Sequence, residues 1–223
     1  MLTPSVRSCS MLAAALFASV ALTAAPAFAQ AGKPAPATPQ AALDALEAAI
    51  TAADARSALA LITPDGQKRL TKDAVMGSLA MLAFMDPNDP NPMGPKPAAS
   101  ELAAKQKAYT AAKTSIAAAL KPSGLDAALG KPLMPAQEIV DAKIGAADPM
   151  TLVPALFDAA VKAGPGLGMK EKPRLMKVGP FTGLKVDGDH ATVKSGPRTL
   201  KIDKIGGKWL IDAPLPEIEA PPQ

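Results

Sequence analysis

The chain has few of the side chains from which catalytic and metal sites are most often built. Its 223 residues include one histidine, His190, and one cysteine, Cys9. A conventional catalytic triad would have to use His190 as its base, and a zinc motif with two histidines is impossible. The sequence also contains neither G-x-S-x-G nor S-x-x-K. It therefore gives no positive sign of a familiar hydrolase.

Aromatic residues are also scarce, with one Trp, one Tyr and five Phe. We therefore expect a core made mainly of Ala, Leu, Val, Ile and Met. Proteins that bind single-stranded nucleic acid stack its bases on aromatic side chains. The scarcity of aromatic residues in this sequence therefore argues against a nucleic-acid partner.

The first 29 residues have the features of a secretory signal peptide. Arg7 precedes a short apolar run, and Ala27 and Ala29 supply the small residues of a cleavage site. Because Cys9 lies within this leader, we expect a disulfide-free mature protein, periplasmic or secreted, with no transmembrane segment. A Pro/Ala-rich tether (residues 30–39) and a Pro-rich tail (214–223) are expected to flank a single domain, residues 40–213.

Residues 40–164 have the apolar spacing of helices. Asp54 is expected to cap a second short helix after one that begins near residue 40. The TPDG segment, residues 63–66, predicts a turn, and Thr71 is expected to cap a third helix. Further helices are predicted from a Ser100 cap to about residue 120, in short pieces near 125–129 and 136–143, and from 148 to 164.

Two segments that suggest a ligand fail on closer reading. The GPGLG segment, residues 164–168, follows a helix, whereas a phosphate loop follows a strand. We expect a flexible connector there. Residues 86–97 begin like a calcium loop with Asp86 and Asn88 but lack its glycine and its final Glu. The sequence therefore predicts neither a cofactor nor a metal.

Between residues 174 and 213 the apolar period changes from 3.6 to 2, which indicates strands. Gly206 and Gly207 suit a tight hairpin. The alternation predicts an antiparallel meander of three to five strands, with one apolar and one basic face. The expected apolar positions are Leu184, Val186, Val193, Leu200, Ile202, Trp209 and Ile211, and the opposite positions are Lys185, Lys194, Lys201 and Lys208. The predicted fold class is α+β, with N-terminal helices packed on a curved C-terminal sheet.

The two ends of the expected domain resemble a known superfamily. The early segment TPQAALDALEAAITAADARSALALITPDG and the closing VDGDHATV and LKIDKIGGKWLIDAP are similar to exported members of the nuclear transport factor 2-like superfamily. The resemblance implies a cone-shaped α+β domain in which a bent antiparallel sheet wraps around helices. That fold hosts enzymes, binding modules and scaffolds, so it implies no single function.

Three functions stay open on this evidence. The first is a non-enzymatic binding domain of the bacterial cell envelope with an unknown ligand, whose pocket would be lined by Tyr109, Phe157 and Trp209. The second is an envelope scaffold that contacts anionic partners through the four lysines, since residues 162–208 carry 11 basic and 4 acidic side chains. The third is an enzyme with His190 as acid or base beside Asp187 or Asp189.

Overall fold

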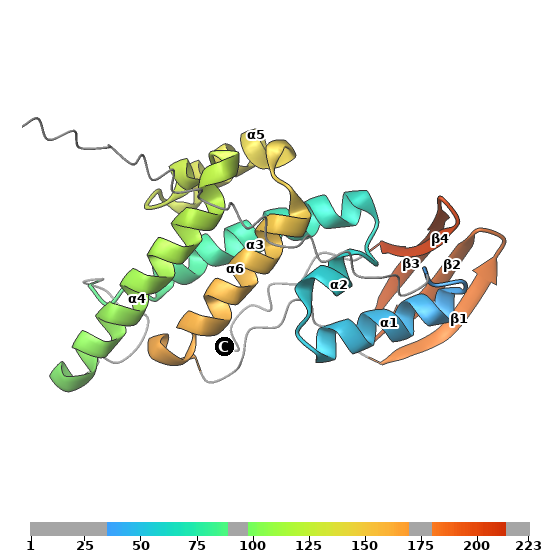
Figure 1. The fold of residues 1–223 in the computed structure, drawn as a ribbon, viewed down its shortest axis with the longest axis horizontal. Helices are drawn as coiled ribbons and strands as arrows, with labels where there is room; N and C mark the ends of the chain where they lie inside the picture. The colour runs from blue at the N-terminus through green and yellow to red at the C-terminus, as the bar shows by residue number, and fades with distance from the viewer. Residues whose placement is uncertain (1–34, 89–97, 170–179, 213–223) are drawn as a thin grey trace, which may run out of the picture. The chain divides into compact units, whose positions relative to one another are not determined.

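The computed structural model describes residues 35–88, 98–169 and 180–212. The expected signal peptide and the Pro-rich tail lie outside these residues, as does most of the proline-rich segment 86–97. Within the described part, helices precede a four-stranded sheet, which confirms the α+β class (Figure 1). None of the described helices is both long and apolar enough to cross a bilayer.

Helix α1 (Pro39–Thr51) packs on one face of the sheet, and α2 (Ala55–Leu59) adds Ala58 and Leu59 to the same buried cluster. Helix α1 begins at Thr38, whose hydroxyl accepts a hydrogen bond from the amide of Ala41. Helix α2 begins at Asp54, as predicted, and Asp54 accepts hydrogen bonds from both the amide and the hydroxyl of Ser57. These bonds hold the pKa of the Asp54 carboxyl below its ordinary value.

Helix α3 (Pro64–Phe84) begins a full two turns earlier than predicted. Thr63 accepts a hydrogen bond from the amide of Gly66, and Pro64 occupies the first helical position, where its missing N–H costs nothing. TPDG is thus a helix start and not a turn, so this prediction was wrong. Thr71 lies inside the helix and donates its hydroxyl to the Gln67 carbonyl.

The remaining helices form a second group with α3. They are α4 (Ala99–Leu120), the 3₁₀ turns η1 (Lys121–Ser123) and η2 (Leu125–Ala128), α5 (Leu133–Lys143), the 3₁₀ turn η3 (Ile144–Ala146) and α6 (Pro149–Ala163). Helix α4 is capped by Ala98 and not by the predicted Ser100. Helix α6 starts at the predicted Asp148 cap and continues through Pro154.

The GPGLG segment is a packed turn and not the flexible connector that the sequence suggests. Residues Pro165–Leu167 form the 3₁₀ turn η4, and Leu167 is buried among the helices. A Cβ on Gly166 would lie 2.6 Å from the Cβ of Ala108 in α4, so only glycine allows this close approach. The segment therefore holds the end of α6 against α4.

The sheet is an antiparallel meander in the order β1 (Phe181–Asp187), β2 (His190–Ser195), β3 (Arg198–Ile205) and β4 (Lys208–Asp212). Gly206 and Gly207 both have positive φ, as the predicted tight hairpin requires. The outer edge of β4 is paired with the segment between α2 and α3. The amide of Thr63 donates to the Ile211 carbonyl at 3.0 Å, and the amide of Ile211 donates to the Leu61 carbonyl at 2.8 Å. This pairing covers one edge of the sheet and fixes the start of α3.

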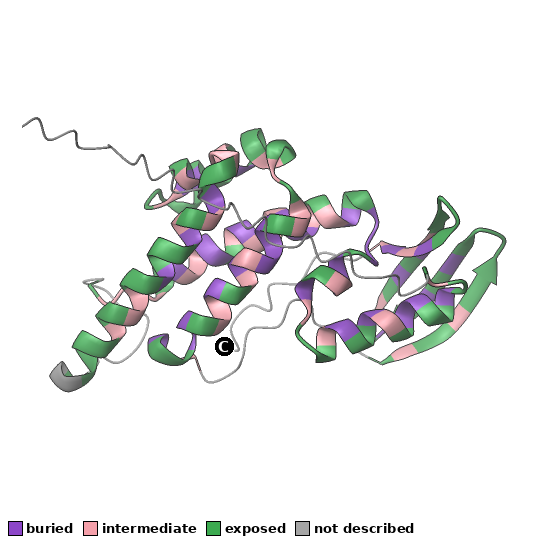
Figure 2. Cartoon of the chain, viewed as in Figure 1, coloured by how far each residue is buried: buried purple, intermediate pink, exposed green. Residues whose placement is uncertain are grey.

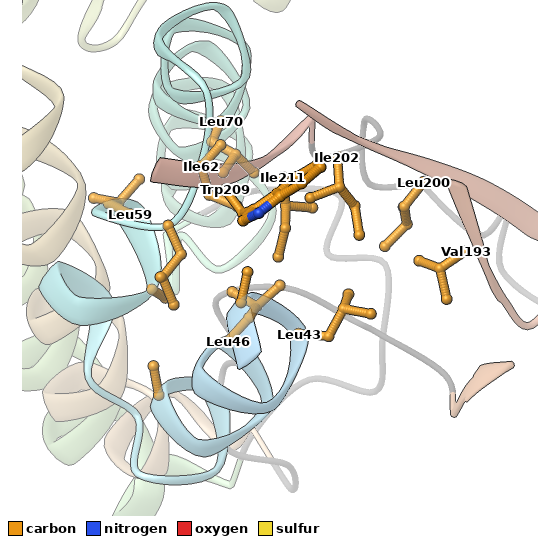
Figure 3. Close-up of a cluster of buried hydrophobic side chains, with 14 of the residues drawn as sticks. Leu43, Leu46, Leu59, Ile62, Leu70, Val193, Leu200, Ile202, Trp209 and Ile211 are labelled. Atoms are coloured by element: carbon orange, nitrogen blue, oxygen red, sulfur yellow. The ribbon is translucent and has the colours of Figure 1, made fainter. Parts of the chain in front are cut away.

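Two groups of buried side chains hold the fold together. The sheet cluster joins α1 and α2 to the strands, and its large members include Leu43, Leu46, Leu59, Ile62, Val193, Leu200, Ile202, Trp209 and Ile211 (Figure 3). The helix cluster joins α3 to α6 through residues such as Val75, Ile116, Leu120, Leu125, Val140 and Leu156. Helices α3 and α6 contribute to both clusters, through Leu70 and Val153 in the first and Val75 and Leu156 in the second.

Candidate functional site

The outer face of the sheet is the surface opposite α1, and its residues follow from the strand pairing. Thr192 lies between Lys185 on β1 and Lys201 on β3, and Lys194 lies between Thr182 and Thr199. Residues that pair across an antiparallel sheet share a face. The lysines and threonines therefore alternate both along the strands and across them. We call these six residues the Thr–Lys face. All six are exposed (Figure 2).

A bulge in β1 creates part of this pattern. The register slips between Thr182 and Lys185, where Gly183 has a φ of 65°. The extra residue lets Thr182 and Lys185 both face outward, although strict alternation would put residues three apart on opposite faces. The sequence indicated the lysines, but it did not indicate the threonines as their partners.

The four predicted lysines all lie on the outer face, but they do not form one group. Lys208 pairs with Ile205 at the β3–β4 hairpin, four residues along β3 from Lys201. At about 3.4 Å per residue this separates Lys208 from the Thr–Lys face by about 14 Å. Within the described part of the chain, no ion pair is made by any of the four lysines. Their charges are therefore open to an external partner.

The acidic residues of the outer face gather at the end of the sheet that holds the β1–β2 and β3–β4 hairpins. Asp187, His190 and Asp203 pair across β1, β2 and β3 at the hairpin end of the sheet, with Asp189 in the adjacent turn. The carboxylate nearest to the Thr–Lys face is Asp212, the cross-strand neighbour of Lys201. Asp212 already accepts hydrogen bonds from Arg69 and Thr63 of the adjoining helix start. The Thr–Lys face itself therefore carries three lysines and no carboxylate, and Asp212, Asp203 and Asp187 lie at its border.

His190 lies in solvent. Its side chain is 80% exposed, and its Nδ1 is 2.7 Å from Oδ1 of Asp203. The hydrogen bond and charge of Asp203, with smaller contributions from Asp189 and Asp187, raise the pKa of His190 above its ordinary value. The structure thus brings together the three predicted acid/base residues, but on an exposed surface where no described residue excludes water from the His190 ring.

The three predicted pocket aromatics are not brought together. Trp209 is 5% exposed and belongs to the sheet cluster, with the Lys204 ammonium 5.9 Å from its ring centre. Tyr109 packs at the edge of the helix cluster, and Phe157 is half-buried on α6. Tyr109 lines a hollow in the helical part of the molecule, and Trp209, Phe157 and His190 do not line it.

The described residues contain no group of three or more His, Cys, Asp or Glu side chains that could hold a metal ion. Asp86 of the rejected calcium loop accepts hydrogen bonds from the Asn88 amide and the Tyr109 hydroxyl. Its carboxylate thus organises the end of α3.

Comparison with family models, curated protein sequences and solved structures found no match. The resemblance to the nuclear transport factor 2-like superfamily therefore stays a prediction. The exposed surfaces of the molecule are therefore the basis for inferring its function.

Proposed function

We propose that this protein is an exported, non-enzymatic interaction domain that binds an anionic polymer of the cell envelope through the Thr–Lys face. The observation that carries the proposal is the group of Lys185, Lys194 and Lys201 around exposed threonines, with none of their charges paired among the described residues. Such a surface attracts and orients polyanions.

The spacing of the lysines favours a polymer over a single small anion. Neighbouring strands lie about 4.8 Å apart and residues two apart along a strand are about 6.8 Å apart. The Cα atoms of Lys194 and Lys201 are then about 8 Å apart, and those of Lys185 and Lys201 about 10 Å. Repeated phosphate or sulfate groups on one chain could meet several ammonium groups at once, while the threonine hydroxyls between them offer hydrogen bonds.

A polymer also fits this face better than a bilayer does. The six residues of the Thr–Lys face include no large apolar side chain that could enter the acyl region of a membrane. The exposed apolar residues of the sheet, Val186 and Ile205, lie toward the acidic hairpin end.

The test is binding of the mature protein to long-chain polyphosphate and to dextran sulfate at several salt concentrations. We expect saturable binding that weakens as salt rises, because exposed charges are screened. The triple variant Lys185→Gln, Lys194→Gln, Lys201→Gln should bind more weakly by about tenfold or more, since each lost contact is worth about 1 kcal/mol.

The matched control is Lys105→Gln, Lys107→Gln, Lys121→Gln, which removes the same charge from the surface of the helical part. This control should retain most of the affinity. Equal weakening in both triple variants would mean that only net charge matters. Absence of binding at low salt, or preference for phosphatidylglycerol vesicles over both polymers, would also contradict the proposal.

A further inference from the structure

A second binding feature lies in the helical part of the molecule, away from the sheet. A hollow of about 240 Å³ opens between the end of α3, the middle of α4 and the segment that leads into α5. It is lined on the α3 side by Leu79 and Leu82, on the α4 side by Tyr109, and opposite them by Leu129. None of these residues belongs to the Thr–Lys face, so polymer binding there does not involve this hollow.

The backbone of the connecting segment keeps the hollow open. Leu129 is extended, with a ψ of 134°, and Gly130 has a φ of 70°, so the chain turns away from the helices here. A Cβ on Gly130 would meet no atom within 4 Å, so the space beside this residue is open.

The lining combines an apolar floor with a basic rim. Leu79 and Leu82 are each 6% exposed and form part of the helix cluster, so their positions are fixed by packing. Lys113 of α4 and Lys131 border the same hollow and are exposed. Among the described residues neither lysine forms an ion pair.

Among the described residues that line the hollow, Asp86 supplies the one carboxylate, and both of its oxygens accept hydrogen bonds. Asp86 Oδ1 accepts the Asn88 amide at 2.9 Å, and Oδ2 accepts the Tyr109 hydroxyl at 3.3 Å. Burial of Tyr109 and the negative charge of Asp86 together raise the pKa of the Tyr109 hydroxyl, which stays protonated and keeps this bond. Among the described residues Asp86 makes no ion pair with Lys113 or Lys131. The described lining therefore carries two ammonium groups and one hydrogen-bonded carboxylate, a net charge that favours an anion.

We infer that this hollow binds a short amphipathic monocarboxylate, whose apolar chain lies on Leu79, Leu82 and Leu129 and whose carboxylate meets Lys113 and Lys131. The volume of the hollow limits the length of the ligand's carbon chain. Sites for drug-sized ligands hold about 300–1,000 Å³, and a water takes about 30 Å³ in the liquid. The hollow thus has room for about eight atoms of the size of a water, which suits a chain of about six to eight carbons.

The experiment is a titration of the isotope-labelled mature protein with hexanoate, followed by methyl NMR. The methyl signals of Leu79, Leu82 and Leu129 should shift and saturate, while those of Leu200 in the sheet cluster should not. Hexanol, which has the chain without the charge, and acetate, which has the charge without the chain, should each bind at least about tenfold more weakly.

Two variants locate the site. The double variant Lys113→Gln, Lys131→Gln should reduce the affinity for hexanoate to about that for hexanol, whereas Lys105→Gln, Lys107→Gln should not. Ala83→Trp, at an exposed lining position, should fill the hollow and abolish the shifts while leaving polyphosphate binding unchanged. Absence of saturable shifts up to millimolar hexanoate, equal binding of hexanol, or unchanged affinity in Ala83→Trp would overturn the inference.

Discussion

The inner and outer faces of the sheet come from the same four strands but have opposite surroundings. On the inner face Val193, Leu200 and Ile202 are at most 1% exposed, and they share a buried cluster with Leu43 and Leu46 of α1 (Figure 3). On the outer face the neighbouring Lys194 and Lys201 are exposed, and no described helix covers them. Successive residues of one strand therefore belong either to the core or to the solvent.

This division separates stability from binding. Side chains of the inner face contribute the free energy of folding through apolar burial. Charged residues of the outer face contribute little to stability, because exposed charges are well solvated. The outer face is thus free to carry residues selected for a partner, and substitutions there should change binding without unfolding the protein.

The sharpest test of this division uses two adjacent residues of β3. Ile202 is fully buried in the sheet cluster and Lys201 points outward. We expect Ile202→Ala to lower the free energy of unfolding by about 2–5 kcal/mol, because it removes buried atoms and leaves a cavity. Lys201→Ala should change it by less than about 0.5 kcal/mol. Urea unfolding followed by Trp209 fluorescence measures both, and similar losses in the two variants would remove the distinction between the faces.

The alternation of apolar residues and lysines was sufficient to predict both faces of the sheet. Because a strand has a side-chain period of two, Lys185, Lys194, Lys201 and Lys208 had to lie opposite Ile202 and Trp209 once the apolar set was buried. The exception is Val186, which was expected in the core but is 55% exposed. It pairs with the buried Ala191, so it does lie on the core side, but β1 is an edge strand with no fully buried residue.

The first residue of α3 could not be predicted from the local sequence. TPDG suits a turn as well as it suits a helix start, since Pro and Asp favour both. Whether this segment forms a turn or starts a helix depends on the pairing of residues 61–63 with Ile211, which is about 150 residues away in the chain. The hollow beside Tyr109 was missed for a similar reason, because Leu79, Lys113 and Leu129 meet only in the folded helices.

A second prediction concerns the edge where the two faces meet. Thr63 caps α3 and its hydroxyl also lies 3.3 Å from Asp212 at the end of β4, whereas Thr38 caps α1 at an exposed position. Both are threonine caps with a proline next. We expect Thr63→Ala to cost about 2 kcal/mol and Thr38→Ala about 0.5 kcal/mol, at the two ends of the range for such caps. Thermal unfolding compares them, and a larger cost at Thr38 would show that the pairing with β4 does not stabilise the start of α3.

The smallest expected effect concerns His190 on the outer face. Its pKa in the folded protein is raised above the ordinary value of 6.5 by Asp203, so the folded protein holds the proton more tightly than the unfolded chain does. The stabilising contribution of the pair is therefore fully present below about pH 6.5 and is lost as the pH rises through the higher pKa of the folded state. We expect the difference in melting temperature between the wild type and His190→Gln to be greatest at acidic pH and to vanish at alkaline pH.

An NMR titration of the single histidine ring gives the same pKa directly, and Asp203→Asn is the matched variant. Removing the charge of Asp203 while keeping its shape should lower the pKa of His190 toward 6.5. Since the ring is exposed, salt should have a similar effect by screening Asp203, Asp189 and Asp187. A His190 pKa at or below 6.5 in the wild type would mean that the acidic end of the outer face does not act on this residue.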